Sequence, residues 1–388
     1  MTIPITTDIF HTTPPADGFD FPADNETVKI FPGITVFSEF LDGVRSSFSN
    51  STLLNRGHVV SGGLISNGVF FSGGANGKIV NGPGGQITGF AGAVMNDLGS
   101  NVFDNYGLVA SNNFFAGLLF ATDATTVLLN NYGTVFSLAA AVEITANSTG
   151  GLIQNYSRIE GGTGIYVHIP SSQTTIINNH PGGIIRGTTY AIDADSGGYA
   201  LHNYGTIIGE IIGFLGTHQI IVNHGKINGE VVLSNGNDIF NGAGGTSGNI
   251  IANGGNDHII AGNGKVLIAL GEGSDTVTAG PGHDQIRFDS ALLGQIDKIT
   301  NFHHAVDEIV LTEEDFTAIG TGAIGHLLAK ADFHVGTQAV TASQYIIYDP
   351  HTGFLYYDSD GSGPALQKHF ATLSAHLNLT HTDFLVQG

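Results

Sequence analysis

The sequence contains no cysteine and no tryptophan, and its 388 residues include only 12 Lys and Arg against 33 Asp and Glu. The absence of cysteine excludes disulfides, which fits either a secreted protein without them or a cytosolic one. A formal net charge of −21 gives a surface that repels nucleic acid and anionic lipid and favours divalent cations. No apolar run approaches the roughly 20 residues that a membrane-spanning helix needs. We therefore expect neither a nucleic-acid partner nor a membrane span.

Glycine, by contrast, is abundant, with 57 residues. Between Leu233 and Arg287, turns of the form G-x-D-x-apolar recur at multiples of nine residues, with one ten-residue unit. Glycine permits the tight turns, and the aspartate supplies a hard carboxylate oxygen of the kind that Ca²⁺ prefers. The residue two places on is apolar and begins a short strand, at Phe240, Ile259, Ile268, Val277 and Ile286. This is the spacing of the nonapeptide that binds calcium in a parallel β-roll.

The aspartates predict where the metal binds. Two nonapeptides make one turn of a β-roll, so alternate units stack at the same edge and place Asp238, Asp257 and Asp275 in one column. The opposite column keeps a single carboxylate, Asp284. We expect about two calcium sites, between Asp238 and Asp257 and between Asp257 and Asp275. Backbone carbonyls of the turns would complete them, near Asn235, Gly236, Asn253, Gly255, Glu272 and Gly273.

A second, longer period precedes the nonapeptides. Asparagines recur at steps of 20 to 26 residues, at Asn55, Asn81, Asn105, Asn131, Asn155, Asn179, Asn203 and Asn223. An apolar residue lies two places before each asparagine, and Val or Ile lies four places after six of them. This pattern predicts an all-β fold, a right-handed parallel β-helix (β-solenoid), with the asparagines forming an internal ladder between coils. A leucine-rich horseshoe would instead require several Leu at fixed offsets.

The periods also predict the domain organisation. Residues 1–50 lack the asparagine pattern and are expected to form an N-terminal cap, partly flexible. Residues 51–232 form β-helix coils of about 24 residues, residues 233–290 the β-roll, and residues 291–388 a C-terminal β-rich cap. The step from Asn223 to Asn241 is already 18 residues, so we expect one solenoid whose coils narrow into the β-roll.

The nonapeptides resemble the calcium-binding repeat of the RTX family (hemolysin-type repeats), and two later segments extend the resemblance. Residues 296–311, IDKITNFHHAVDEIVL, are similar to the segment that follows such repeats, although Asn301 replaces a common aspartate. Residues 346–388, with Tyr348-Asp349 and Tyr356-Tyr357-Asp358, resemble the C-terminal region read by type I secretion. The resemblance implies Ca²⁺ as cofactor, a type I secretion apparatus as partner, and a bacterial protein that is secreted or on the cell surface. The N-terminus has no basic start or apolar core of a Sec-type signal.

A row of aromatic residues is the candidate ligand surface. The residue after the repeated asparagine is aromatic at Tyr106, Tyr132, Tyr156, His180, Tyr204 and His224. If these side chains point outward, they form a stripe with a spacing of about 4.8 Å, which suits sugar rings. The alternative is a stacking ladder that stabilises the corner of the coils.

The sequence favours a secreted, calcium-dependent structural or adhesive protein that folds on calcium after export. Two alternatives stay open: a polysaccharide-active enzyme (lyase or C5-epimerase), with an extracellular polysaccharide as partner, and a self-assembling filament or surface-layer subunit. The enzyme is disfavoured because the Lys and Arg of the coils lie at different offsets. Asp349-Pro350-His351 matches a motif of alginate C5-epimerases but lies in the expected cap, so no catalytic residue is assigned.

Overall fold

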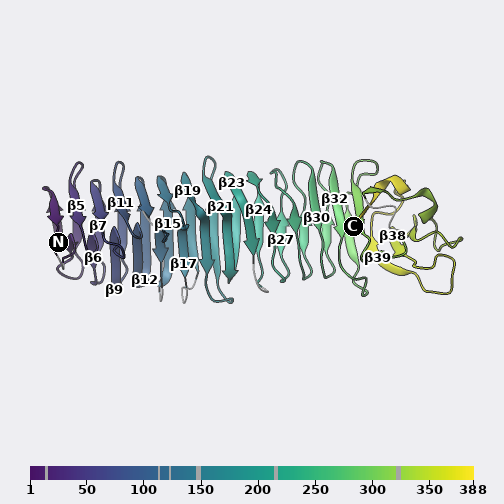
Figure 1. Cartoon of the computed structure of the whole chain (residues 1–388), viewed down its shortest axis with the longest axis horizontal. Coiled ribbons are helices and arrows are strands. Elements are labelled where there is room, and N and C mark those ends of the chain that lie inside the picture. Colours follow the sequence, from purple (N-terminus) through teal and green to yellow (C-terminus); the bar gives the residue numbers. More distant parts are fainter. Residues whose placement is uncertain (14–15, 112–113, 122–123, 146–149, 214–216, 320–324) are drawn as a thin grey trace. The chain divides into compact units, whose positions relative to one another are not determined.

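The computed structural model describes residues 1–13, 16–111, 114–121, 124–145, 150–213, 217–319 and 325–388. The chain is nearly all β, with 51% strand and 2% helix. It divides into two compact units, Met1–Gly213 and Phe214–Gly388. Each unit is built from coils whose strands pair in parallel with those of the next coil, so the predicted β-solenoid class is confirmed (Figure 1). A continuous run of coils through residue 213 stays a prediction.

The Met1–Gly213 unit has three strand columns. The first holds β1 (Thr2–Ile5), β4 (Thr27–Ile30), β7 (Thr52–Asn55), β10 (Lys78–Asn81), the end of β12 (Ala93–Asn105), β15 (Ala124–Asn131), β18 (Gly151–Asn155), β20 (Thr174–Asn179) and β22 (Gly198–Asn203). The second holds β2 (Ile9–His11), β5 (Thr35–Ser38), β8 (His58–Ser61), β11 (Gln86–Gly89), β13 (Leu108–Ser111), β16 (Thr134–Phe136), and the starts of β19 (Arg158–His168), β21 (Ile184–Ser196) and β23 (Thr206–Gly213). The third holds β3 (Phe19–Asp20), β6 (Val44–Ser46), β9 (Val69–Ala75), the start of β12, β14 (Leu118–Phe120), β17 (Ala140–Thr145) and the ends of β19, β21 and β23.

The core of this unit follows from the alternation along each strand. Leu53, Ile79 and Phe103 are in register on adjacent coils and are fully buried, because every second side chain points inward. Two residues later the asparagine ladder runs from Asn55 to Asn203, with each Nδ2 donating to the Oδ1 of the next coil at 2.8–2.9 Å. The predicted internal ladder is thus confirmed in this unit.

Residues 1–50 differ from the expected cap. Thr2 pairs with Thr27, and Thr27 with Thr52, so these residues already form coils in register with those that follow. Ile30 occupies the position of the asparagine at Asn55. Coil pairing depends on the backbone and on the buried apolar column, and it therefore continues where the asparagine pattern is absent.

The Phe214–Gly388 unit has narrower coils with two main strand columns. One holds β24 (Ile220–Asn223), β27 (Ile239–Asn241), β29 (His258–Ile260), β31 (Thr276–Thr278), β33 (Asp297–Thr300) and β39 (Lys368–Thr372). The other holds β26 (Val231–Val232), β28 (Ile250–Ile251), β30 (Val266–Ala269), β32 (Asp284–Phe288), β34 (Glu308–Thr312) and β40 (Phe384–Gln387). β25 (Lys226–Asn228) lies between β24 and β26 in sequence.

The end of this unit forms a small β-rich layer. It contains β35 (His326–Leu327), β36 (Phe333–Val335), β37 (Ile346–Tyr348), β38 (Phe354–Tyr357) and two short 3-10 helices, η2 (Lys330–Asp332) and η3 (His381–Asp383). β37, β38 and β39 pair antiparallel. Within the residues described, no helix has the length and apolar character needed to cross a membrane.

Candidate functional site

The three predicted aspartates lie directly above one another, each immediately before a strand of the β-roll. The Oδ1 of Asp257 accepts the backbone N–H of Asp238 at 2.7 Å, and the Oδ1 of Asp275 accepts that of Asp257 at 2.8 Å. Asp297 continues the column by accepting the N–H of Asp275 at 2.8 Å. We call Asp238, Asp257, Asp275 and Asp297 the aspartate ladder. Sequence reasoning missed Asp297 because it follows a longer step of 22 residues, although it opens the next strand.

In two members of the ladder, the second carboxylate oxygen has no partner among the residues that the structure describes. Asp257 and Asp275 are 2% and 1% exposed, and in each the Oδ2 atom is buried with no hydrogen bond to any described group. Burial raises the pKa of Asp257 to about 7 and that of Asp275 to about 8. A buried carboxylate oxygen without a partner costs about 1–3 kcal/mol. These two oxygens therefore fit a site that is completed by a bound cation.

Asp238 is different, because the protein itself satisfies its carboxylate. Its Oδ1 accepts the N–H of Gln219 at 2.6 Å, and its Oδ2 accepts both the N–H and the hydroxyl of Ser234 at 2.8 Å. Within the aspartate ladder, the buried carboxylate oxygens that have no partner among the described residues are thus the Oδ2 atoms of Asp257 and Asp275. The assignment of Asp238 as a ligand stays a prediction.

The glycine turns beside the ladder stack so closely that a side chain would not fit. Gly255 and Gly273 have φ values of +113° and +139°. A Cβ atom at Gly255 would lie 2.1 Å from the carbonyl oxygen of Gly236, and one at Gly273 would lie 1.6 Å from that of Gly255. Each of these carbonyls therefore points at the next turn, as a calcium site between turns requires.

The same turns line an acidic groove of about 770 Å³. It brings together Asn235, Asn253, Gly255 and Glu272 of the predicted set. The carbonyl oxygens of Asn253 and Glu272 accept backbone hydrogen bonds at 2.7 and 2.9 Å, and each retains a second lone pair. The groove also contains three carboxylates that sequence reasoning did not assign, Asp289, Glu314 and Asp315. Asp289 lies 18 residues after Gly271 and accepts its N–H at 3.0 Å, so the period of the roll could have located it. Glu314 and Asp315 follow the repeats, and no spacing rule connects them to the groove.

The opposite edge of the β-roll carries a shorter pair of carboxylates. The Oδ2 of Asp284 accepts the N–H of Gly280 at 2.6 Å, and its Oδ1 is buried without a partner among the described residues. Asp307 follows on the next coil and accepts the N–H of Asp284 at 3.0 Å. Burial raises the pKa of Asp284. This edge therefore offers one further position for a cation.

No described part of the chain brings three His, Cys, Asp or Glu side chains together as metal ligands. A transition-metal site of that type is thus not present among those residues. A calcium site at the aspartate ladder depends instead on single carboxylates combined with backbone carbonyls, the oxygen ligands that Ca²⁺ accepts.

The predicted aromatic stripe is both exposed and stacked. The rings of Tyr106, Tyr132, Tyr156 and His180 lie parallel on successive coils, with centroid distances of 4.8, 4.5 and 3.9 Å. The three tyrosines are 38–44% exposed and Tyr204 is 49% exposed. In the Phe214–Gly388 unit, the Nδ1 of His224 lies 2.9 Å from the carbonyl of Ala243. The two alternatives for the stripe are therefore compatible: the rings stack, and their edges face solvent.

A cluster of polar side chains on the outer face of β19 and β21 was not predicted. Asp195 accepts the hydroxyl of Tyr166 at 2.5 Å and lies 2.6 Å from the Nδ1 of His168. Asp193 is in register with Tyr166, and burial together with the charge of Asp195 raises the pKa of Asp193 to about 6. The alternation of the strands placed the two aspartates on one face, but their partners come from the preceding coil.

Comparison with known proteins gives one match. The family model of the RTX calcium-binding nonapeptide repeat matches residues 251–286 in four copies. No curated protein and no solved structure matches the chain. RTX nonapeptide repeats bind calcium, and the matched residues include Asp257, Asp275 and the turns around them. The chain thus carries RTX calcium-binding nonapeptide repeats, folded as coils of a β-solenoid.

Proposed function

We propose that the protein is a secreted structural or adhesive protein of the bacterial surface or matrix, exported by a type I apparatus and folded by calcium. The observation that carries the proposal is the pair of Oδ2 atoms of Asp257 and Asp275, which are buried without a hydrogen-bond partner among the described residues. Calcium bound at these oxygens would give each of them the partner that it lacks. Its binding energy would then contribute directly to folding.

The charges of the aspartate ladder determine how folding responds to the calcium concentration. At low calcium, the ionised carboxylates of the aspartate ladder repel one another and resist burial, which keeps the repeats open and suited to export. At the higher calcium concentration outside a cell, the metal neutralises the ladder and the coils close. Residues 346–388, which resemble a type I secretion region, would supply the export signal. Removing them in cells that carry a type I apparatus should retain the protein inside.

Calcium-dependent folding can be tested by circular dichroism and limited proteolysis of the full chain. With calcium, the Phe214–Gly388 unit should resist protease, and the spectrum should show full strand content. In EDTA, or with Mg²⁺ at the same concentration, cleavage should concentrate in residues 233–290. A β-roll equally resistant in EDTA would refute the folding role of calcium.

A second candidate function is a polysaccharide-active enzyme, and the cluster around Asp195 favours it. His168 and Tyr166 are oriented by one carboxylate, and Asp193 has a raised pKa close to the range that general acid–base catalysis uses. Incubation with acidic and neutral polysaccharides should then yield reducing ends or unsaturated sugars. An Asp195→Asn variant should abolish the products, and equal product from wild type and variant would exclude this cluster.

A further inference from the structure

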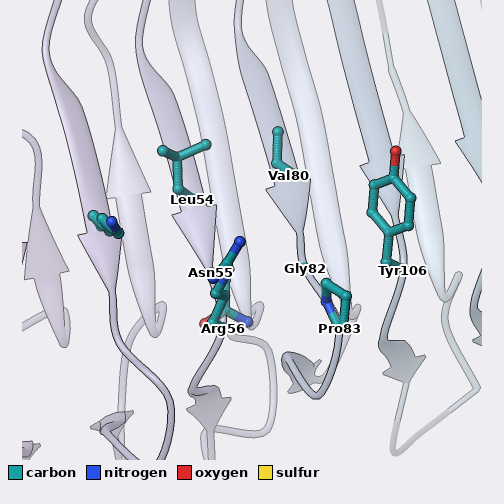
Figure 2. Close-up of a pocket in the computed structure, with 8 residues that line it drawn as sticks. Leu54, Asn55, Arg56, Val80, Gly82, Pro83 and Tyr106 are labelled. Atoms are coloured by element: carbon teal, nitrogen blue, oxygen red, sulfur yellow. The ribbon is translucent and has the colours of Figure 1, made fainter.

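A pocket of about 330 Å³ lies on the outer face of the first strand column in the Met1–Gly213 unit. Leu54 of β7 and Val80 of β10 form its apolar floor, and the ring of Tyr106 stands beside them (Figure 2). Arg56 and Lys29 also line the pocket. Its volume falls at the lower end of the range typical of small-molecule sites, about 300–1,000 Å³.

The pocket exists because the aromatic stripe is interrupted. Asn81 is in register with Asn105, so the residue one coil before Tyr106 in the stripe is Gly82. Tyr106 stacks on Tyr132 on one side, whereas Gly82 has no side chain to cover the other. The open face of Tyr106 is thus turned toward Pro83 and Val80 across the pocket (Figure 2). This leaves room for one flat ring of a ligand.

The charges around the pocket are unusual for this chain. Arg56 and Lys29 form no ion pair with any described carboxylate, and the Nζ of Lys29 lies 4.8 Å from the centre of the Phe31 ring. Asp104, which is in register with Val80, is bound by Lys78 at 3.3 Å. The other four Lys and Arg side chains of the unit each have a carboxylate partner within 4.0 Å: Arg45, Lys78, Arg158 and Arg186. The pocket therefore combines two uncompensated cations with an apolar floor and an aromatic face.

We propose that this pocket binds a uronate, a carboxylate-bearing sugar unit of an acidic polysaccharide. The apolar face of the sugar ring would lie on Tyr106 and the floor, and its carboxylate would accept two hydrogen bonds from the guanidinium of Arg56. A neutral sugar would leave Arg56 and Lys29 without a counter-charge. The proposal names the ligand of the adhesive role suggested above, but it requires only that the coils of Met1–Gly213 are folded.

Titration calorimetry on the full chain, saturated with calcium, tests the proposal with trigalacturonate as the probe and cellotriose as the neutral control. We expect trigalacturonate to bind more tightly than cellotriose by at least about tenfold. Arg56→Gln and Tyr106→Ala should each weaken trigalacturonate binding by about tenfold. Arg186→Gln removes the same charge outside the pocket and should leave the affinity within about twofold.

Circular dichroism of each variant distinguishes lost binding from lost folding, and Tyr106→Leu replaces Tyr106→Ala if the alanine variant unfolds. The proposal is overturned if trigalacturonate does not bind to the folded chain, or if cellotriose binds as tightly. It is also overturned if Arg186→Gln weakens binding as much as Arg56→Gln, or if a poly-glutamate peptide competes equally well. Binding should persist in EDTA, because the pocket lies in the Met1–Gly213 unit, whose coils are expected to stay folded without calcium, so the two proposals fail separately.

Discussion

Replacing Asp257 by asparagine should weaken calcium binding and reduce the stability that calcium provides. Asp257 uses its two oxygens differently, since Oδ1 accepts the N–H of Asp238 at 2.7 Å and Oδ2 is buried with no partner in the described part of the chain. Asparagine has one oxygen and one NH₂ group. If the oxygen keeps the bond to Asp238, the NH₂ group faces the metal position, and an N–H donor cannot bind a cation.

The size of the effect follows from the loss of one charged ligand. Changes to the surroundings of a metal site alone typically cost 10- to 100-fold in affinity, so we expect a loss of at least about tenfold. In excess calcium, a tenfold loss lowers the stabilisation by about 1.4 kcal/mol. For a unit of this size, that corresponds to a decrease of about 3–6 °C in the unfolding midpoint.

Calcium titration calorimetry and thermal unfolding at fixed calcium measure the two quantities. In EDTA the variant should be at least as stable as wild type near pH 8, because asparagine removes a charge whose burial is unfavourable. Glu39→Gln is the control, since Glu39 is exposed and lies in the other unit. If Asp257→Asn binds calcium like wild type and keeps the same gain in midpoint, Asp257 is not a ligand.

Three further predictions concern the pH dependence, the asparagine ladder and the glycine turns. In EDTA the Phe214–Gly388 unit should lose stability as pH rises from 5 to 9. Burial raises the pKa values of Asp257 and Asp275 to about 7 and about 8, and a carboxyl group whose pKa is higher in the folded state destabilises that state once it ionises. Calcium should remove this trend, and melting curves at each pH with and without calcium measure it. Asn131→Ala should cost about 3 kcal/mol in the free energy of unfolding, because it removes hydrogen bonds to both neighbouring coils and leaves their buried groups unpaired. A loss of under 1 kcal/mol in denaturant unfolding would contradict the role of the asparagine ladder. Gly273→Ala should prevent calcium-induced folding, because its Cβ would lie 1.6 Å from a carbonyl oxygen. Gly182→Ala, also at positive φ but with open space around it, should cost only about 1–2 kcal/mol in the free energy of unfolding. Equal effects of the two variants would show that the close stacking of the turns is unimportant.

The periodic part of the fold was predictable from the sequence because each coil repeats the same contacts. The spacing of the asparagines located the ladder, and the G-x-D turns located the stack of Asp238, Asp257 and Asp275. Features without a period were not predictable. The capping of Asp238 by Ser234 depends on a hydroxyl within a turn, and the grouping of Asp195 with Tyr166 and His168 depends on which coil positions lie side by side.

Sequence reasoning also placed too much weight on asparagine at the N-terminus. Residues 1–50 were expected to cap the solenoid because they lack the asparagine pattern, yet their strands pair with the same register as later coils. Val28 and Val36 are fully buried there, so the inward apolar positions continue where the asparagine pattern is absent. The pocket beside Tyr106 has a related origin, since a single glycine in the stripe leaves a space that only the stacked arrangement reveals.

Hydrogen exchange resolved along the chain tests the central claim most directly, because it measures the protection of each backbone N–H with and without calcium. We predict that amides of β27, β29 and β31 are protected in calcium and exchange rapidly in EDTA near pH 8, while amides of β15, β18 and β20 are protected in both. Equal protection of β29 and β31 in EDTA and in calcium would contradict the account, since the aspartate ladder would then fold without its metal.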